Sequence, residues 1–576
     1  MHVLGINFYH NDSSVALIKD GIVINAIAEE RLNRRKHSSA FPINTIKEIL
    51  NYHNLDLQDI DLISLNTNPK ITFRKIFYLL KNIPSKDLLF NAFNRYRKKK
   101  SLNQIFIDNF KYNPKKKIIY VDHHLSHINS GFLISPFDEC LSLSLDGFGD
   151  FKSSSYGISK KNNTEIYGNI YFPHSLGVFY QSLTQFIGFK NYGDEYKLMG
   201  LSAYGENKYE NKLYDLVSYK NMSYELDLKF FKHHNCNIQE LDKNGDLIYK
   251  DLFNKENLEE LLKLKSKNEF IYSKEVADIS KSVQNVYENI FFKYLNDLYE
   301  KFDQNNLCFS GGCALNSLAN GKILDRTKFK KVFVPYEPSD AGGSIGSALT
   351  CFYEKNKNKK KIFQPNPYLG IDYSQKHTNH ILEKYKAEKK IKVKNFDNFN
   401  ELCSKTAELL DAQSIISWFQ GKMEFGPRAL GNRSIIMDPR NKDAKQILNL
   451  KIKLRENFRP FAPSILKEET IKWFERDESA DYMTFVYKIK INKKDKIPAV
   501  CHVDGTGRLQ TVDEKINPKF YQLIKSFFQK TDIPLIINTS FNENEPIVNN
   551  PEHAIETFLK TNLDYLVINN SLIEKI

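Results

Sequence analysis

Residues 3–18 read VLGINFYHNDSSVALI, in which two short apolar runs flank the polar turn NFYHNDS. The runs at residues 3–6 and 14–18 are rich in branched aliphatic side chains, which predicts two buried strands. Asp20-Gly21 then signals a hairpin into a third strand at residues 21–28. We therefore expect the chain to open with three consecutive strands, the first two joined by a polar turn.

The same pattern returns further along the chain. A predicted strand at residues 140–145 leads into the acidic turn DGFGD, residues 146–150, and a partner strand follows at residues 153–158. Two such units indicate an internal duplication. The arrangement resembles the actin/Hsp70-like nucleotide-binding fold, in which phosphates lie between two halves. We therefore expect an α/β fold with a duplicated, actin-like N-terminal domain.

Two glycine-rich turns support a ligand site in this domain. The strand at residues 306–309 is followed by SGGCALN, residues 310–316, and the strand at residues 331–335 by SDAGGSIG, residues 339–346. Paired glycines let a backbone approach a ligand closely, and a helix N-terminus presents free N–H groups to an anion. In the second turn, Ser339 or Asp340 could instead serve only as a helix N-cap.

The stretch VDHHLSH, residues 121–127, carries two imidazoles one helical turn apart. His123 and His127 are four residues apart, so on a helix their side chains project from the same face. A predicted strand at residues 117–121 leads directly into this helix, which is a common way to build a metal site. On the motif alone, structural or solvent-facing histidines are the more common outcome.

Size and composition restrict the class of protein. The chain has 576 residues, of which 41% are hydrophobic. This length exceeds what a single hydrophobic core usually supports, so we expect two or more domains. We find no apolar run long enough to span a bilayer and no secretory leader at the N-terminus. The seven cysteines include no CxxC pair, which argues against a disulfide framework or a zinc ribbon. These features predict a protein of the reducing cytoplasm.

The net charge of +14 raises the question of nucleic acid. Much of the charge lies in short basic clusters at residues 97–100, 115–117 and 359–361. Solvated loops explain such clusters in a lysine-rich protein, and part of the charge could attract phosphorylated small substrates. We do not expect nucleic acid as the main partner.

The second half of the chain predicts a separate domain. Residues 1–355 form the predicted actin-like domain, and the polar, basic stretch at residues 356–395, interrupted by prolines, predicts a connecting segment. From residue 396 to residue 576 helical and strand patterns alternate with polar loops, with a helix at residues 399–412 and a strand at residues 414–418. We expect a mixed α+β domain there.

Cationic loops mark this second domain. The loop FQGKMEFGPRALGNRS, residues 419–434, contains two arginines, a lysine and three glycines. In KIKLRENFRP, residues 451–460, alternation would place Lys451, Lys453 and Arg455 on one face if the segment were extended. Converging guanidinium groups suit bidentate binding of phosphate. The competing interpretation is that each arginine pairs with a surface carboxylate.

Taken together, these motifs resemble the O-carbamoyltransferase family, which includes the nodulation-factor, cephem and aminoglycoside carbamoyltransferases. The resemblance extends over most of the chain, and its matching stretches are residues 5–14, 122–127, 197–201, 310–316, 340–343, 423–434, 459–463 and 538–542. It implies an N-terminal half like the actin-like protein that transfers threonylcarbamoyl to tRNA. It also implies a C-terminal half similar to the YrdC-type threonylcarbamoyl-AMP synthase domain.

The resemblance also implies residue roles in the first half. His10 would act as general base on the acceptor hydroxyl. A divalent metal, iron or zinc, would be bound by His123, His127, Asp146 and Asp340. The adenylate would be held by Asn11, Asp12, Lys197, Gly311, Gly312 and Asn316.

In the second half, Arg428 and Lys453 are implied as catalytic residues. Carbamoyl phosphate and ATP, with its Mg²⁺, would be held by Arg428, Lys453, Arg455, Arg459, Arg508, Asn538 and Ser540. The expected activity is ATP-dependent formation of carbamoyl-adenylate, followed by carbamoyl transfer to a hydroxylated acceptor.

The acceptor stays open between a sugar, an antibiotic, a polyketide and a glycan unit, and a homodimer is compatible with the sequence. Residues 209–272, polar and rich in aromatic side chains, could be an acceptor-side insertion or a helical structural segment. Two alternatives remain. One is carbamoylation or threonylcarbamoylation of a nucleic acid, and the other is a non-catalytic, actin-like nucleotide-binding scaffold.

Overall fold

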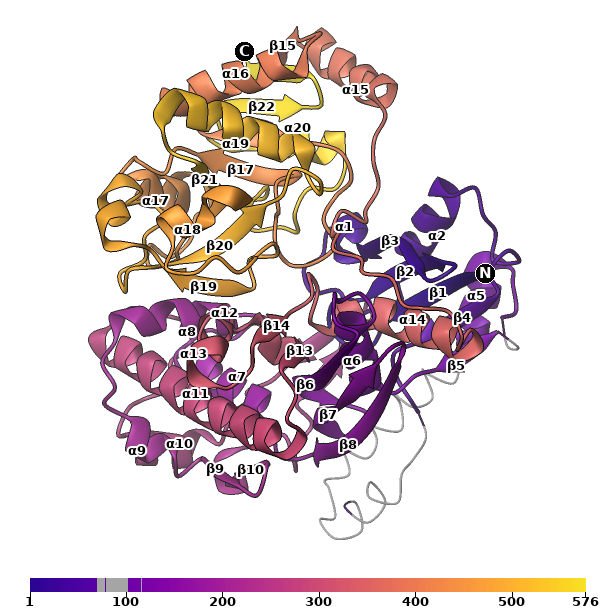
Figure 1. Ribbon diagram of the computed structural model, residues 1–576, viewed down its shortest axis with the longest axis vertical. Helices are drawn as coiled ribbons and strands as arrows, with labels where there is room; N and C mark the ends of the chain where they lie inside the picture. Colours follow the sequence, from indigo (N-terminus) through magenta and orange to yellow (C-terminus); the bar gives the residue numbers. More distant parts are fainter. Residues whose placement is uncertain (70–77, 79–101, 115–116) are drawn as a thin grey trace. The chain divides into compact units, whose positions relative to one another are not determined.

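The computed structural model describes residues 1–69, 78, 102–114 and 117–576, and it divides into two compact units (Figure 1). The first unit comprises residues 1–30, 37–316 and 322–364, and the second comprises residues 31–36, 317–321 and 365–576. The basic cluster at residues 97–100 and most of that at residues 115–117 lie outside the described residues. Each unit is considered by itself.

Two five-stranded sheets form the first unit. The first has the order β3-β2-β1-β4-β5 and the second the order β8-β7-β6-β13-β14. In both, the three strands of an antiparallel meander are followed by two parallel strands, so the sheets share one topology. The strands are β1 (His2–Asn7), β2 (Ser14–Lys19), β3 (Ile22–Ala28), β4 (Leu62–Leu65), β5 (Ile118–Tyr120), β6 (Glu139–Gly149), β7 (Lys152–Lys160), β8 (Asn163–Tyr171), β13 (Asn306–Ser310) and β14 (Lys331–Phe333).

Helices α6 (His123–Phe132) and α14 (Gly343–Lys355) lie between these sheets, as Figure 1 shows. Helix α14 packs on β1, β2 and β4, α6 packs on β6 and β13, and the two helices pack on each other. Gly346 allows this close approach, because a Cβ there would lie 1.8 Å from the carbonyl oxygen of Ser126. The helix that carries His123 and His127 is therefore held at the centre of the unit.

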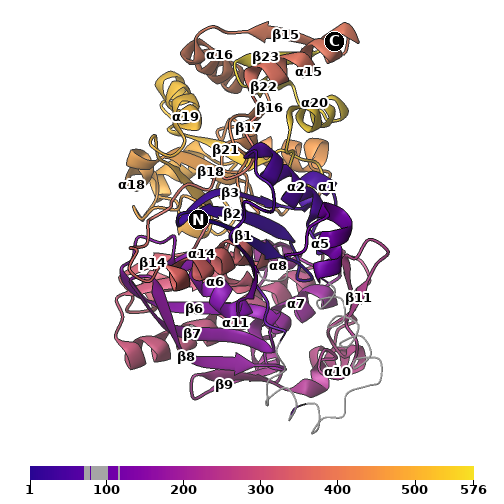
Figure 2. The ribbon, with the colours of Figure 1, turned by 90° about the vertical axis from the view of Figure 1, so that its right-hand side faces the viewer.

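The remaining elements of the first unit surround this centre. The long helix α11 (Lys274–Phe302) packs near the second sheet, where the Tyr294 hydroxyl lies 3.2 Å from that of Ser154. The other described elements are α2 (Ile43–Tyr52), α5 (Leu102–Phe110), α7 (Leu176–Phe186), α8 (Glu195–Leu201), α9 (Glu210–Leu213), β9 (Val217–Lys220), β10 (Ser223–Leu226), β11 (Gln239–Leu241), β12 (Leu247–Tyr249), α10 (Lys255–Leu262) and α13 (Ile323–Arg326). Residues 209–272 thus contain two hairpins as well as short helices (Figure 2).

The second unit is built on a nine-stranded mixed sheet with the order β15-β23-β22-β16-β17-β21-β18-β20-β19. Helices α16 (Phe399–Asp411) and α19 (Pro518–Thr531) pack against each other. The strands are β15 (Ile391–Asn395), β16 (Ile416–Phe419), β17 (Arg433–Met437), β18 (Ala462–Leu466), β19 (Phe485–Lys488), β20 (Thr506–Val512), β21 (Leu535–Ser540), β22 (Tyr565–Ile568) and β23 (Ser571–Lys575). The other helices are α12 (Ser317–Asn320), α15 (Gln375–Ala387), α17 (Ala444–Ile447), α18 (Thr470–Trp473) and α20 (Pro551–Lys560), and α1 (Glu30–Asn33) belongs to this unit except for Glu30.

Two sequence expectations differ from this structure. Residues 146–149 belong to strand β6 rather than to a turn, with a register shift against β7 between Leu145 and Gly149, and the chain reverses at Asp150 and Phe151. The stretch expected as a connection, residues 356–395, contains helix α15 and strand β15, which pairs with β23 at the edge of the large sheet. Prolines 365 and 367 interrupt only its first part, so they do not mark the whole stretch as a linker.

None of the described helices combines the length and the apolar character needed to cross a membrane.

Candidate active site

Helix α6 begins where its sequence predicts. The Asp122 side chain caps the helix by accepting from the Leu125 backbone N–H at 3.1 Å, and the Lys152 ammonium lies 2.7 Å from its other oxygen. The four-residue spacing then places His123 and His127 on one face, with their Nε2 atoms 3.0 Å apart. Both side chains are fully buried.

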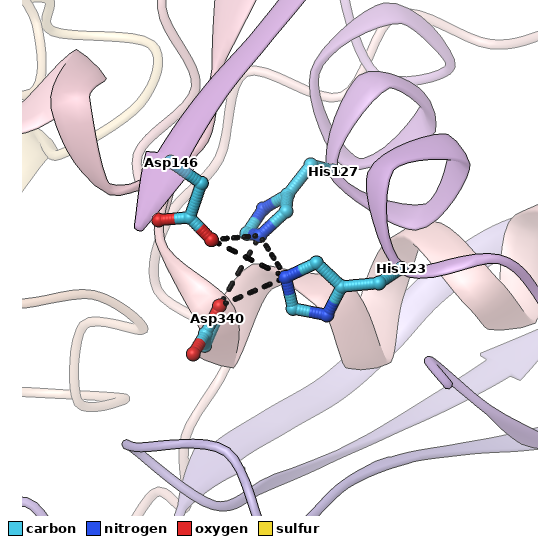
Figure 3. A group of neighbouring side chains, drawn as sticks. All are labelled: His123, His127, Asp146 and Asp340. Atoms are coloured by element: carbon cyan, nitrogen blue, oxygen red, sulfur yellow. Dashed lines mark hydrogen bonds and ion pairs between the residues drawn. The ribbon is translucent and has the colours of Figure 1, made fainter. Parts of the chain in front are cut away.

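Two aspartates from other elements face these imidazoles (Figure 3). Asp146 in β6 places Oδ2 3.3 Å from each Nε2 atom. Asp340, which opens the short 3₁₀ turn Asp340–Gly342 before α14, places Oδ1 3.2 Å from His127 Nε2 and 3.4 Å from His123 Nε2. All four ligand atoms lie within 4.8 Å of one another. The structure therefore brings together the four residues that the resemblance implied.

The electrostatics of this group suit a divalent cation. Burial would lower the pKa of His123, but hydrogen bonds and charges of the two aspartates hold it well above its usual value. Burial would raise the pKa of Asp340, and Asp146 adds to that rise, but the two imidazoles lower it to about 2. Two carboxylates and two imidazoles aimed at one point are a ligand set for Fe²⁺ or Zn²⁺. The residues present therefore fit such an ion.

The third histidine of the motif faces away from this group. His124 Nδ1 lies 2.9 Å from the Ser144 hydroxyl in β6. Burial, together with the neighbouring His123 and His127, lowers its pKa to about 3, so the imidazole is neutral. His124 is thus a buried packing residue rather than a ligand.

Two further contacts orient the ligands. The Gly312 backbone N–H donates to Asp146 Oδ1 at 3.0 Å, which leaves Oδ2 for the imidazoles. A Cβ on Gly312 would lie 2.7 Å from the same oxygen, so a larger residue would displace this carboxylate. Asp150 accepts from the backbone N–H groups of His123 at 2.9 Å and Asn68 at 2.7 Å, and from the Thr67 hydroxyl at 3.0 Å. Neither orienting contact was foreseen from the sequence.

His10 lies beside the same group. It belongs to the turn between β1 and β2, and its ring centroid is 4.6 Å from that of His123. The Asn7 amide shapes this turn by donating to the carbonyl oxygens of Asn11 and Asp12. The structure thus places the residue expected as general base next to the candidate metal ligands.

The six residues expected to hold the adenylate are only partly brought together. Gly311 and Gly312 adjoin Asp146, and a Cβ on Gly311, where φ is +89°, would lie 2.3 Å from the carbonyl oxygen of Leu145. Asn316 exchanges amide hydrogen bonds of 3.1 Å with Gln284 of α11. Lys197 forms a 2.8 Å ion pair with Asp194.

The other two adenylate candidates lie in the first polar turn. The Asn11 amide donates to the Tyr249 hydroxyl. Asp12 Oδ1 lies 2.9 Å from His37 Nδ1, and Asp12, Glu30 and His37 offer a second group of ligand atoms within 4.8 Å of one another. This second group is partly exposed. No motif in the sequence indicated Glu30, His37 or Tyr249.

In the second unit, two buried charges shape the loop between β16 and β17. Glu424 Oε1 accepts from the backbone N–H groups of Leu430, Asn432 and Arg433. The fully buried Arg433 guanidinium donates to the carbonyl oxygens of Gln420, Gly421, Asn432 and Asn549, and it lies 3.6 Å from the centroid of the Phe419 ring. The partly exposed Arg428 belongs to the loop that these contacts fix.

Lys453 is the centre of a cationic cluster in this unit. Its side chain is 1% exposed, and Nζ donates to the carbonyl oxygens of Ser540 and Asn542 and to Asn542 Oδ1, at 2.7 and 2.8 Å for Asn542. Burial lowers its pKa well below the usual value, and Arg455, Lys36 and Arg459 lower it further. Such a group of cations around a buried ammonium suits an anionic ligand.

The extended conformation that would place Lys451, Lys453 and Arg455 on one face is not adopted. Residues 448–452 form a short π-helical turn, and Arg455 folds back so that Nε donates to Asn449 Oδ1 at 2.7 Å. A helical turn closes the loop, so an extended strand with one cationic face does not form. Sequence alternation over five residues cannot distinguish these two conformations.

The other residues expected to bind phosphate, Arg459, Arg508 and Asn538, differ in burial and in their partners. Arg459 pairs with Glu456 at 3.2 Å, and Arg508 lies in β20, partly exposed. The Asn538 amide is 1% exposed and donates to Ala429, Ser464 and Gln510, so it ties the Arg428 loop to β21.

Asn542 belongs to the matching stretch at residues 538–542 but was given no role, and the segment at residues 31–36 was missed. Arg31 donates to the carbonyl oxygen of Gly426 at 2.9 Å, and Arg34 donates to that of Ile547 at 2.7 Å, although this basic segment is encoded far from the rest of the unit. The basic run RLNRRK, residues 31–36, was the available signal in the sequence.

The fold and the site define a two-unit α/β protein, with a buried His–Asp group in one unit and a buried cationic cluster in the other. The family model described as Carbamoyltransferase N-terminus matches residues 2–349, and that described as Carbamoyltransferase C-terminus matches residues 407–575. The chain therefore belongs to the carbamoyltransferase family, and it is a carbamoyltransferase enzyme, as the resemblance of its motifs implied.

The chain is also similar to relatives over nearly its whole length. "Uncharacterized protein sll1178" of Synechocystis sp. is 36% identical over 100% of this chain and 97% of its own length. "Nodulation protein NolNO" of Sinorhizobium fredii is 34% identical over 99% of this chain and 80% of its own length. Among solved structures, the activator of 2-hydroxyisocaproyl-CoA dehydratase from Clostridium difficile covers 63% of this chain and 99% of its own, with 15% identity and a TM-score of 0.32.

Proposed function

We propose that this carbamoyltransferase forms carbamoyl-adenylate from carbamoyl phosphate and ATP in its second unit. The carbamoyl group is then transferred, in the first unit, to a hydroxyl of a small-molecule or glycan acceptor. The first unit would be a duplicated actin-like domain, which its two sheets of equal topology support. The second would be YrdC-like.

The observation that carries this proposal is the His–Asp group with His10 beside it, within a member of the carbamoyltransferase family. His10 would take the proton of the acceptor hydroxyl as its oxygen bonds to the carbamoyl carbon, and AMP would leave. A divalent iron or zinc ion held by His123, His127, Asp146 and Asp340 would supply Lewis-acid polarisation. Asp150 and Gly312 would keep these ligands in position.

In the second unit, atom balance requires that carbamoyl phosphate, ATP and water give carbamoyl-adenylate, pyrophosphate and phosphate. The guanidinium groups of Arg455 and Arg459 would neutralise the phosphate charge, with Mg²⁺ accompanying ATP. Burial and the neighbouring cations lower the pKa of Lys453, and an anion bound beside it would favour its charged form. Arg428 and Arg508 would add bidentate contacts, and Ser540 a hydroxyl. Asn538 would keep the loop in position.

Partial reactions test the proposal. Pyrophosphate release that requires carbamoyl phosphate reports the second unit, and a carbamoyl mass gain of the acceptor reports the first. We expect Lys453→Ala to abolish both readouts and His127→Ala to abolish only transfer. The matched control His380→Ala, on the exposed surface of α15, should retain both. Carbamoyl-phosphate-independent pyrophosphate release, or full transfer by His127→Ala, would contradict the proposal.

A further inference from the structure

Asn316 is the last residue before the chain leaves the first unit. Residues 317–321 belong to the second unit, and Lys322 is the first residue after them that belongs to the first unit again. The chain that follows Asn316 therefore does not help to hold it within the first unit. Further support for the Asn316 amide has to come from another element of that unit.

Helix α11 supplies this support. Gln284 and Glu288 are four residues apart, so their side chains project from one face of the helix. Gln284 Nε2 donates to Asn316 Oδ1 at 3.1 Å, and Asn316 Nδ2 donates to Gln284 Oε1 at 3.1 Å. Lys322 Nζ donates to both oxygens of Glu288, at 2.7 and 2.8 Å. One face of α11 thus holds the chain at both ends of the segment 317–321.

The buried Gln284 amide uses all of its hydrogen-bonding capacity. Its side chain is 1% exposed, and besides the two bonds to Asn316, Nε2 donates to Glu288 Oε1 at 2.9 Å and Oε1 accepts from the Tyr180 hydroxyl at 2.8 Å. Burial raises the pKa of Tyr180 well above its usual value, and the Glu288 carboxylate raises it further. The phenol therefore keeps the proton that it donates.

These partners decide the orientation of two amides in sequence. A carboxylate only accepts hydrogen bonds, so Glu288 must face the nitrogen of Gln284, and the Tyr180 hydroxyl donates to its oxygen. The same nitrogen faces Asn316, which fixes the Asn316 oxygen as its acceptor. The buried Glu288 needs a cation to offset its charge, and the partly exposed Lys322 provides it.

We propose that Gln284 and Glu288 are positioning residues for the adenylate, and that they act through Asn316. Gln284 fixes where the Asn316 amide lies, and Glu288, paired with Lys322, fixes which end of that amide donates. An amide held in one orientation loses less conformational freedom when a nucleotide binds. This inference rests on the proposed function, in which Asn316 would hold the adenylate, and it adds two residues that no motif in the sequence indicated.

The competing interpretation is that these bonds only pack α11 against the turn before Asn316. The two interpretations differ in a double-mutant cycle. If Gln284 and Glu288 act through the Asn316 side chain, their replacement has no further effect on nucleotide binding once that side chain is removed. If they only support the fold, their replacement weakens binding equally with and without it.

Titration calorimetry with AMP, the proposed leaving group, measures this cycle in the full-length protein. All variants carry Arg428→Ala, which should weaken nucleotide binding by the second unit, and the AMP site of the first unit is the one that Asn316→Ala weakens. We expect Gln284→Met, which keeps the side-chain length and removes the amide, to weaken AMP binding by about 10-fold, as for loss of one well-oriented hydrogen bond. In the Asn316→Ala protein the same change should alter it by less than about 2-fold.

A second variant carries the test if Gln284→Met does not fold. Glu288→Gln preserves the shape of the side chain, but its amide can face Gln284 with either end, so we expect weaker AMP binding here too, and again only when Asn316 is present. The matched control is Glu300→Gln on the same helix, where the exposed carboxylate pairs with Lys328 at 2.5 Å. It should retain full AMP affinity.

Three results would overturn the inference: equal weakening of AMP binding with and without the Asn316 side chain, unchanged AMP binding in both the Gln284 and Glu288 variants, or unchanged AMP binding in Asn316→Ala. A failure of the proposed function is recognised separately. In that case the wild-type protein releases no pyrophosphate in response to carbamoyl phosphate, whatever the outcome of the cycle.

Discussion

Asp150 shows how one residue that is not a metal ligand can decide the geometry of the ligands. Its φ of 48° is in the left-handed region, and from there the carboxylate reaches the N-terminus of α6 and the end of β4 together. A carboxylate near a helix N-terminus is also favoured by the helix dipole. Asp150 therefore fixes where His123 begins its helix, although it touches no ligand atom.

We predict that Asp150→Ala lowers both stability and metal retention. Three buried or partly buried donors lose their acceptor, which costs about 1–3 kcal/mol of the free energy of unfolding. Urea unfolding and metal content by mass spectrometry check this, with the exposed Asp215→Ala as control. Unchanged metal content in Asp150→Ala would remove its positioning role.

Glu195 gives a prediction about pH. Burial raises the pKa of this carboxyl from 4.5 to about 7, and Asp194 adds to the rise, whereas its own backbone N–H and nearby His37 oppose it. Between pH 4.5 and 7 the folded state therefore keeps a proton that the unfolded chain has lost. Stability falls as pH rises through this window.

We expect Glu195→Gln, which cannot ionise, to flatten this part of the profile. The difference in thermal midpoint between variant and wild type should grow in favour of the variant from pH 5 to pH 7. Thermal unfolding at half-unit pH steps measures it. Parallel profiles would show that the Glu195 carboxyl has an ordinary pKa.

At the scale of elements, sequence patterns predicted individual helices and turns better than the contacts between distant elements. The four-residue spacing of His123 and His127 and the polar turn before Ser14 follow from local periodicity, and both agree with the structure. Asp146 and Asp340 came only from the family resemblance, because their approach depends on sheet pairing across almost two hundred residues. The loop at residues 451–455 was misread because five alternating residues fit a helical turn equally well.

The packing of α6 on α14 provides a test at this scale. We predict that Gly346→Ala destabilises the first unit and loosens the metal group, because the new Cβ would overlap the carbonyl oxygen of Ser126. Overpacking of this kind costs about 1–3 kcal/mol. Gly507→Ala, where the nearest atom lies 3.4 Å away, is the control. Denaturant unfolding and metal content measure the two effects, and unchanged values of both would contradict the prediction.

At the scale of the whole molecule, the chain order does not follow the division into units. Residues 31–36 and 317–321 belong to the second unit, although both segments lie within residues 1–364, which otherwise form the first unit. Domain limits read along the sequence as 1–355 and 396–576 therefore cannot capture these crossings. Contacts between residues far apart decide them, and these were not visible in composition or periodicity.

The two units give the last prediction, which concerns metal removal. An ion bound by His123, His127, Asp146 and Asp340 stabilises only the unit that contains them, by about 2.7 kcal/mol at one hundred times its dissociation constant. In calorimetry of the full chain, chelation should therefore lower the midpoint temperature of one unfolding transition and leave that of the other unchanged. Adding Fe²⁺ or Zn²⁺ should restore it, and His123→Ala should abolish the response. In the same samples, pyrophosphate release should survive chelation when Mg²⁺ is restored, whereas carbamoyl transfer should not. An equal shift of both transitions would mean that the ion binds elsewhere, because four ligands from one unit cannot stabilise both.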